Sequence, residues 1–171
     1  MTTESRGGTT RTGYLGLGSN IGDPAANLDA AIRKLKSAGI EIEAESARYV
    51  TEPVGEILDQ PDFLNSALRI RTGLEPEELL DVCKRIEVEL GRDPDAPRHS
   101  PRPVDIDLLL LGDIEMENDR LRLPHREVTN RRFVLVPLLD LDPALTLPDG
   151  TRLADCLAAL PDDEQRVDPD G

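Results

Sequence analysis

The order of strand-like and helix-like segments predicts an α+β domain with a ferredoxin-like β-α-β-β-α-β arrangement, an antiparallel sheet with helices packed on it and a C-terminal extension. Two hydrophobic patterns support this prediction. Four segments have the apolar runs or alternation typical of strands, and two have apolar residues at helical spacing. The expected strands are residues 14–17, 40–49, 63–71 and 104–111, and the expected helices are residues 24–38 and 76–90.

Residues that commonly end helices and strands support these boundaries. Asp23 followed by Pro24 is typical of a helix N-terminus, and Gly39 of a helix C-terminus. The glycine-rich segment 16–22 lacks one glycine of the dinucleotide-binding fingerprint, because Ile21 stands at that position. We therefore interpret it as a tight turn from strand to helix. Residues 115–123 predict an edge strand, and residues 153–160 predict a last short helix.

Length and composition predict one domain in the cytoplasm. We place this domain at residues 12–160 and expect disordered tails at 1–11 and 161–171, which lack apolar periodicity. The formal net charge of −14 disfavours nucleic-acid binding, which needs a basic surface. No apolar run is long enough to span a membrane. The two cysteines have neither zinc-binding nor disulfide spacing, so we expect a soluble cytoplasmic protein, and a monomer.

Two aspartates interrupt the predicted strand at 104–111. Asp105 and Asp107 are two residues apart, so on a strand their side chains leave the same face, with α-carbons about 6.5–7 Å apart. Carboxylates this close beside an apolar core repel each other and resist ionisation unless a cation lies between them. Magnesium, which prefers carboxylate oxygens and water, is the ion that fits best.

Arginines precede this pair on a proline-rich segment. Arg98 and Arg102 lie among Pro97, Pro101 and Pro103, which favour an extended chain. Because guanidinium groups bind phosphate oxygens in a bidentate manner, two arginines beside a metal site indicate a polyphosphate ligand. The alternative is a solvated edge strand whose aspartates form ion pairs with these arginines.

The predicted strand at 63–71 has a second pair of candidate ligand-binding residues. Phe63 and Asn65 share the face opposite to that of the core residues Leu64 and Leu68. One aromatic ring and one amide on one face suit a flat heterocycle. A cross-strand packing pair explains these two residues equally well.

Residues 98–111 also resemble a known signature. Their pattern, Arg-x-x-Pro-Arg-x-x-Asp-x-Asp followed by aliphatic residues, is similar to that of the 6-hydroxymethyl-7,8-dihydropterin pyrophosphokinase family of folate biosynthesis. Gly18-Ser-Asn20, and Pro124-His125 followed by Arg131, resemble further blocks of this family. The resemblance implies transfer of pyrophosphate from ATP to the hydroxymethyl group of 6-hydroxymethyl-7,8-dihydropterin, with release of AMP and with two magnesium ions bound.

The resemblance also implies roles for the matching residues. It implies that four residues take part in catalysis, Asp105, Asp107, Arg92 and Arg102, and that the two aspartates also bind the metal. It implies that the following residues bind ATP: Lys84, Glu87, Arg98, Arg102, Leu108, Arg120, Arg122, His125 and Arg131. It implies that the following residues bind the pterin: Thr51, Val54, Phe63, Asn65, His99 and Phe133.

The chain departs from the family pattern at three positions. Pro94 stands where members often have a further arginine, His99 where a tryptophan commonly packs on the pterin, and Arg126 where a tyrosine often follows the histidine. These departures bear on rate and pterin affinity. Two other functions stay open: a different magnesium-dependent phosphotransferase or nuclease, and a catalytically silent nucleotide-binding module.

Overall fold

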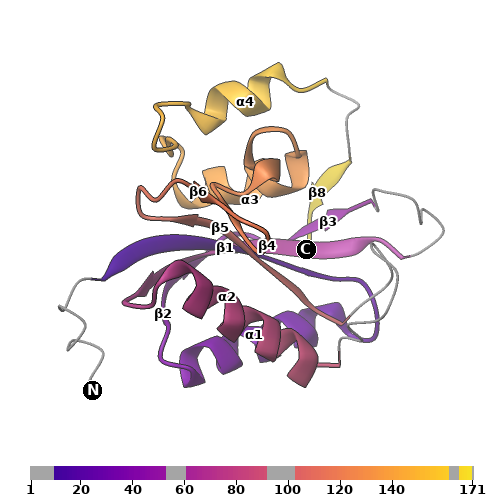
Figure 1. Cartoon of the computed structure of the whole chain (residues 1–171). Coiled ribbons are helices and arrows are strands. Elements are labelled where there is room, and N and C mark those ends of the chain that lie inside the picture. The colour runs from indigo at the N-terminus through magenta and orange to yellow at the C-terminus, as the bar shows by residue number, and fades with distance from the viewer. Residues whose placement is uncertain (1–9, 53–60, 92–102, 162–165, 171) are drawn as a thin grey trace.

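The computed structural model describes residues 10–52, 61–91, 103–161 and 166–170. A six-stranded sheet lies at its centre, between two layers of helices (Figure 1). In chain order the elements are β1 (Arg11–Ser19), α1 (Pro24–Ser37), β2 (Glu41–Glu45), β3 (Tyr49–Thr51), β4 (Phe63–Thr72), α2 (Pro76–Glu89), β5 (Asp105–Leu111), β6 (Met116–Glu117), β7 (Arg122–Leu123), the short helix η2 (Arg126–Thr129), α3 (Arg132–Leu141), α4 (Leu153–Ala159) and β8 (Val167–Pro169).

The sheet confirms the predicted ferredoxin-like arrangement. Its strands lie in the order β5-β1-β4-β3-β8, and β2 pairs with the part of β4 that β3 does not reach. Every one of these pairs is antiparallel. Strand β1 therefore lies between β4 and β5, and it brings these two distant parts of the chain onto one surface.

One face of the sheet packs against α1 and α2. Leu28, Ala31 and Leu35 of α1 repeat at three- and four-residue spacing, and all three are fully buried. They join strand residues such as Leu15 and Leu68 in one hydrophobic core. The apolar periodicity that predicted the helix is therefore the stripe that holds it to the sheet.

The ends of α1 also follow the sequence prediction. The Asp23 side chain accepts a hydrogen bond of 3.2 Å from the backbone N–H of Ala26, and Pro24 is the first helical residue. Gly39 follows the helix with a φ of 90°. That left-handed conformation costs glycine little because it has no Cβ atom.

The C-terminal extension covers the other face of the sheet, as Figure 1 shows for α3 and α4. Val134, Leu135 and Leu138 of α3 and Leu153 of α4 are buried in a second hydrophobic core that includes Leu109 of β5. Strand β5 is therefore covered on both faces, which explains the unbroken run of leucines at 108–111. No helix among the described residues is long and apolar enough to cross a bilayer.

The predicted edge strand at 115–123 is wrong. This segment forms two short strands, β6 and β7, which pair with each other and not with the main sheet. The Asn118 side chain accepts hydrogen bonds from the backbone N–H groups of Arg120 and Leu121. Such local bonds from an asparagine close a tight turn and end an extended strand.

The structure also differs from the expected tails and from the expected glycine turn. Residues 167–169, expected to be disordered, form β8 against β3, and the first strand begins at Arg11. Gly16 and Gly18 lie inside β1. The turn comes later, where Gly22 has a φ of 69°. A short polar strand such as β8 lacks a strong sequence signal, because its partner strand supplies most of its stability.

The first prediction concerns the core beneath the sheet. Leu68→Ala should lower the free energy of unfolding by about 2–5 kcal/mol, because Leu68 is fully buried and the smaller side chain leaves a cavity. Val88→Ala is the control, since Val88 is 53% exposed, and it should change stability by less than about 0.5 kcal/mol. Urea denaturation monitored by circular dichroism measures both. Equal effects of the two substitutions would contradict this placement of the core.

Candidate active site

The carboxylate pair lies on β5, on the face that the C-terminal extension covers. Ile106 and Leu108 are buried in the core on the α1 and α2 side, so Asp105 and Asp107 leave the opposite face. Both aspartates are half-buried. Leu108, expected to bind ATP, therefore does not direct its side chain to this surface, and only its main chain is available there.

Glu87 of α2 supports this strand from its outer edge. The backbone N–H of Ile106 donates a hydrogen bond of 2.7 Å to Oε2 of Glu87, whose side chain is 1% exposed. Lys84 Nζ lies 3.6 Å from Oε1 of the same carboxylate. Because β5 is an edge strand, this N–H would otherwise have no strand partner. Glu87 thus holds the chain between the two aspartates, a structural role that the sequence did not indicate.

Asp107 is in an environment that opposes its negative charge. Burial raises its pKa well above the ordinary value, and the nearby Asp105 and Glu87 carboxylates raise the pKa further, while Lys84 acts in the other direction. A divalent cation between Asp105 and Asp107 would relieve this conflict. In the described part of the chain, no group of three or more His, Cys, Asp or Glu side chains is arranged to hold a metal. A two-carboxylate site fits magnesium, which commonly completes its shell with water and substrate phosphates.

His125 lies beside this pair at the outer edge of β5. Its backbone N–H donates to the carbonyl oxygen of Leu109 at 2.9 Å, and its Nδ1 accepts from the backbone N–H of Glu127 at 3.2 Å. The proton of the neutral ring is therefore on Nε2. Burial lowers the pKa of His125, although Glu127 and Asp105 act to raise it. The neutral ring offers an N–H donor for an anion.

Two glycines of β1 connect the carboxylates to the candidate residues on β4. Asp105 is opposite Gly18, which on its other side is opposite Asn65, and Asp107 is opposite Gly16 in the same way. Residues directly opposite in a sheet share a face, so Asp105 and Asn65 lie on one surface about 10 Å apart, two strand spacings. Glycine leaves this strip of the sheet without side chains. A Cβ atom at Gly18 would be 2.6 Å from Oδ1 of Asn65.

Three expected ligand residues meet at the far end of this strip. The Asn65 amide donates to the hydroxyl oxygen of Thr51, and both side chains are buried. Phe63 pairs directly with Thr51 across β3 and β4, and its side chain is half-buried. The fixed amide and the adjacent ring are the groups expected around a flat, polar heterocycle.

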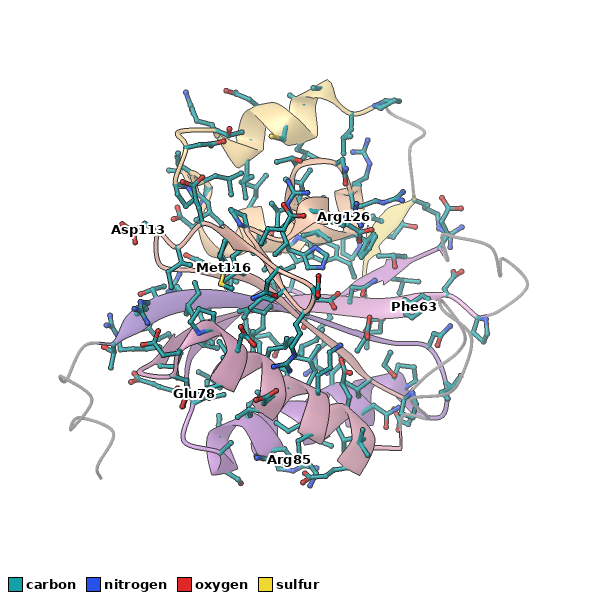
Figure 2. The ribbon with its side chains drawn as sticks, in the orientation of Figure 1. Phe63, Glu78, Arg85, Asp113, Met116 and Arg126 are labelled. Atoms are coloured by element: carbon teal, nitrogen blue, oxygen red, sulfur yellow. The ribbon has the colours of Figure 1, made fainter. Side chains whose placement is uncertain are left out.

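The arginines of the described residues differ in the side of the sheet on which they lie, in exposure and in ion-pair partners. Arg131 and Phe133 come at the start of α3, where Nε of Arg131 is 3.7 Å from Oε2 of Glu127. Figure 2 shows Arg126 on the α3 side of the sheet and Arg85 on the opposite side. Arg122 is exposed, and Arg120 forms ion pairs with Glu77 and Asp81 of α2. Arg120 would have to leave those partners to contact a nucleotide.

Five expected site residues lie outside the described residues. They are Val54, Arg92, Arg98, His99 and Arg102. The described part therefore brings together the carboxylate pair and His125 at one end of the strip, and Thr51, Phe63 and Asn65 at the other. Chemically, this surface is suited to hold a cation with phosphate groups beside a planar ring.

Most of the chain matches a known protein family. The sequence model of the 7,8-dihydro-6-hydroxymethylpterin-pyrophosphokinase (HPPK) family matches residues 14–143, which include every site residue described above. The chain belongs to this family.

Several relatives match this HPPK over most of its length. The 2-amino-4-hydroxy-6-hydroxymethyldihydropteridine pyrophosphokinase of Methylorubrum extorquens is 46% identical over 157 residues, 91% of this chain and 98% of that protein. The Pseudomonas aeruginosa protein of the same name is 41% identical over 149 residues, 86% of this chain and 91% of that protein. The folate synthesis bifunctional protein of Arabidopsis thaliana is 46% identical over 127 residues, 74% of this chain, which spans only 26% of that protein.

Solved structures show the same fold. A Plasmodium falciparum HPPK-DHPS crystal structure superposes on this HPPK with a TM-score of 0.69 and covers 92% of the chain at 16% identity. The superposed part is 47% of that longer chain. The ferredoxin-like domain is therefore retained at low sequence similarity.

The place of Gly16 and Gly18 between the two groups of the candidate site, and the place of Glu127 beside it, were not predicted from the sequence. Gly16 and Gly18 have the same two-residue spacing as Asp105 and Asp107, and that spacing could have indicated a bare strand face. Glu127 acts on the pKa values of both Asp107 and His125. It had no sequence signal, because only the fold brings η2 next to β5.

The second prediction concerns the pH dependence of stability in this HPPK. Because the pKa of Asp107 is raised in the folded state, the metal-free protein should lose stability as the pH rises from about 4 through that raised pKa. Asp107→Asn should remove this loss. Magnesium should restore the stability of the wild type at high pH, by about 2.7 kcal/mol at a hundredfold excess over its dissociation constant.

Thermal unfolding between pH 5 and pH 8, with and without magnesium, measures these effects. Asp113→Asn is the matched control, because Asp113 is an exposed aspartate just beyond the other end of β5 (Figure 2). Equal stabilisation of the wild type and Asp107→Asn by magnesium would contradict the metal site.

Proposed function

We propose that this HPPK transfers pyrophosphate from ATP to the hydroxymethyl group of 6-hydroxymethyl-7,8-dihydropterin, giving AMP and the pterin diphosphate for folate biosynthesis. One observation carries the proposal: in the Asp105–Gly18–Asn65 register, a carboxylate pair and an amide–aromatic group share one face of the sheet, with a glycine between them. The separation of about 10 Å leaves room for phosphate groups between a cation and a planar ring.

Asp105 and Asp107 would hold the magnesium, with two ions in the full complex. The ions would neutralise phosphate charge and polarise the transferred group. The remaining ligands would be phosphate oxygens and water, since the described residues supply no third acidic or histidine ligand in a cluster. Glu87 contributes by fixing β5 through the N–H of Ile106, which sets the spacing of the two carboxylates.

The triphosphate would be positioned by cationic and N–H groups around this pair. The Nε2–H of His125 would donate a hydrogen bond to a phosphate oxygen, and Arg131 would add a guanidinium group at the start of α3. The family resemblance adds Arg92, Arg98 and Arg102, together with Lys84 and Arg122, as further phosphate and nucleotide contacts. Charge compensation from several directions is what this transfer requires, because negative charge is spread over the phosphate oxygens.

The pterin would bind at the other end of the strip. Asn65 presents a fixed amide to the polar edge of the ring, and its hydrogen bond to Thr51 removes the freedom of that amide to rotate. Phe63 and Phe133 supply aromatic surfaces for stacking, a contact of about 1 kcal/mol beyond burial. The resemblance places Val54 and His99 in the same pocket.

The reaction itself needs alignment more than a strong base. The hydroxymethyl oxygen forms a bond to the β-phosphorus while the bond from that phosphorus to the oxygen of the α-phosphate breaks, so AMP leaves and the hydroxyl proton passes to solvent. The residues at the two ends of the strip hold donor and acceptor in line, which converts binding energy into rate. No side chain of the described surface has to accept the proton.

We infer a cytoplasmic monomer that acts on small molecules. Both cysteines are free thiols, and burial, with Glu87 and Asp107, raises the pKa of Cys83 to about 12. Two free thiols, of which Cys83 is buried and Cys156 is half-buried, are consistent with a reducing compartment.

The third prediction tests the activity. AMP should form from ATP only when the pterin is present, and Asp107→Asn should lower kcat at least about 100-fold, since losing a metal ligand costs about 3 kcal/mol or more of transition-state stabilisation. Asp113→Asn should keep wild-type turnover. Coupled detection of AMP at saturating magnesium measures both. Turnover of Asp107→Asn within tenfold of wild type would refute the metal role, and ATP breakdown without pterin would favour a different phosphotransferase.

The fourth prediction concerns the bare strip. Gly18→Ala should weaken pterin binding about tenfold, because the new Cβ atom, 2.6 Å from Oδ1 of Asn65, forces that amide away from its position. Gly16→Ala is the comparison, since its Cβ atom meets only the Leu109 side chain, at 3.3 Å, and should have a smaller effect on pterin binding. Calorimetric titration with pterin in the presence of an ATP analogue measures the affinities. Unchanged pterin binding in Gly18→Ala would place the pterin elsewhere.

A further inference from the structure

We propose that Arg166 is a positioning residue for pterin binding, acting through Asp62 and Glu52 on the ends of β3 and β4. The inference rests on the proposed function, because it assigns the pterin to Thr51, Phe63 and Asn65. Arg166 and β8 lie beyond residue 143, where the match to the HPPK family model ends. This chain thus adds a support for its substrate site that the family match does not include.

Arg166 connects the end of one strand to the start of another. Its backbone N–H donates to Oε1 of Glu52 at 2.6 Å, and its carbonyl oxygen accepts from the backbone N–H of Glu52 at 3.4 Å. Its guanidinium group forms an ion pair with Asp62 and a second, at 3.2 Å, with Asp168. Glu52 directly follows Thr51, and Asp62 directly precedes Phe63. One residue therefore joins the main-chain neighbours of two pterin-binding residues.

Strand β8, which directly follows this arginine, is anchored at its other end as well. The backbone N–H of Asp170 donates to the carbonyl oxygen of Arg48 at 2.8 Å. The Arg48 guanidinium in turn pairs with Asp29 of α1 and with Glu45 of β2, at 2.7 Å and 2.9 Å. Attachment at both ends makes β8 a fixed support, and the placement of Arg166 does not depend on its own ion pairs alone.

Strand β3 needs such a support. It has only three residues, and without β8 it would be the edge of this part of the sheet. Short edge strands open at low free-energy cost. Val167 of β8 lies opposite Thr51, which lies opposite Phe63, so β8 extends the row that contains the pterin-binding side chains.

The effect should be specific to the pterin. In the sheet order, β8 is next to β3, whereas the carboxylates lie on β5, four strand spacings away, or about 19 Å. A shift at the β3 end of the sheet therefore disturbs Thr51 and Phe63 before it reaches Asp105 or His125. The alternative is an ordinary surface ion pair, since the Arg166 side chain is 51% exposed. Such a pair contributes little to stability or to substrate binding. A positioning residue and an ordinary surface ion pair therefore predict different effects of removing the guanidinium group on the KM for each substrate.

Steady-state kinetics of Arg166→Ala in the full-length chain separates them. The KM for pterin should rise about fivefold, which corresponds to about 1 kcal/mol of binding free energy, while kcat and the KM for ATP stay within about twofold. Exchanging the two charges, in the double variant Asp62→Arg with Arg166→Asp, should restore part of the pterin KM that either single substitution loses. Arg85→Ala is the control, since it removes an exposed ion pair with Glu89 on the opposite side of the sheet.

Hydrogen exchange gives a second measurement that does not depend on the activity. In Arg166→Ala the backbone amides of residues 50–52 and 62–65 should exchange faster, and those of β5 should not change. An unaltered pterin KM with unaltered exchange, or equal rises in the KM for both substrates, would overturn the proposal. If the wild type forms no AMP with pterin, the proposed function fails, and hydrogen exchange together with pterin titration decides the role of Arg166 separately.

Discussion

The structure depends on the register in which β1 pairs with β4 on one side and β5 on the other. Asp105, Gly18 and Asn65 are opposite one another only in this register, and successive side chains of a strand leave opposite faces. A slip of one residue would send the carboxylates into the core beneath the sheet and bring Ile106 to the surface. The leucines that fill the core on both sides prevent that slip, because each register error would expose them. Packing of the core thus determines where the polar residues of the site stand.

The same packing places Asp107 where its charged form is unfavourable in the metal-free protein. Asp107 is half-buried, close to Asp105, and opposed by the buried Glu87, so its pKa is raised. Glu87 could be replaced by an apolar residue of similar size if stability alone mattered, but then the outward N–H of Ile106 would lose its partner. The protein instead keeps three carboxylates near one edge strand. In the proposed function, a bound cation would relieve their mutual repulsion, and this relief would contribute to its affinity.

The two ends of the site are held by different parts of the chain. Helix α2 holds the carboxylate end through Glu87, and β8 holds the opposite end through Arg166. The C-terminal extension packs with α3 and α4 on another part of the same face, which includes Tyr14, Ala67 and Leu109 (Figure 1). In the proposed function, this division would separate the binding of a metal and phosphates from the binding of a flat ring, so substitutions at one end should leave the other nearly unchanged. The carboxylate end and the Asn65 end nevertheless share one rigid sheet, which keeps the distance between the reacting groups constant.

The sequence by itself determined the elements whose signals are local and strong. The apolar periodicity of α1 and α2, the caps at Asp23 and Gly39, and the Asp105–Asp107 pair within an apolar strand all had the expected structure. Where local signals were weak, the structure differed: residues 115–123 form a short hairpin, residues 167–169 form β8, and Gly16 and Gly18 belong to a strand. Only the tertiary structure decided that Glu87 supports Ile106, that Glu127 lies near His125, and that Arg166 reaches Asp62. The physical reason is that a spacing in the sequence determines which face a side chain takes, whereas its partners come from the pairing of segments that can be far apart in the chain, such as Tyr49 and Pro169. That pairing depends on the whole core.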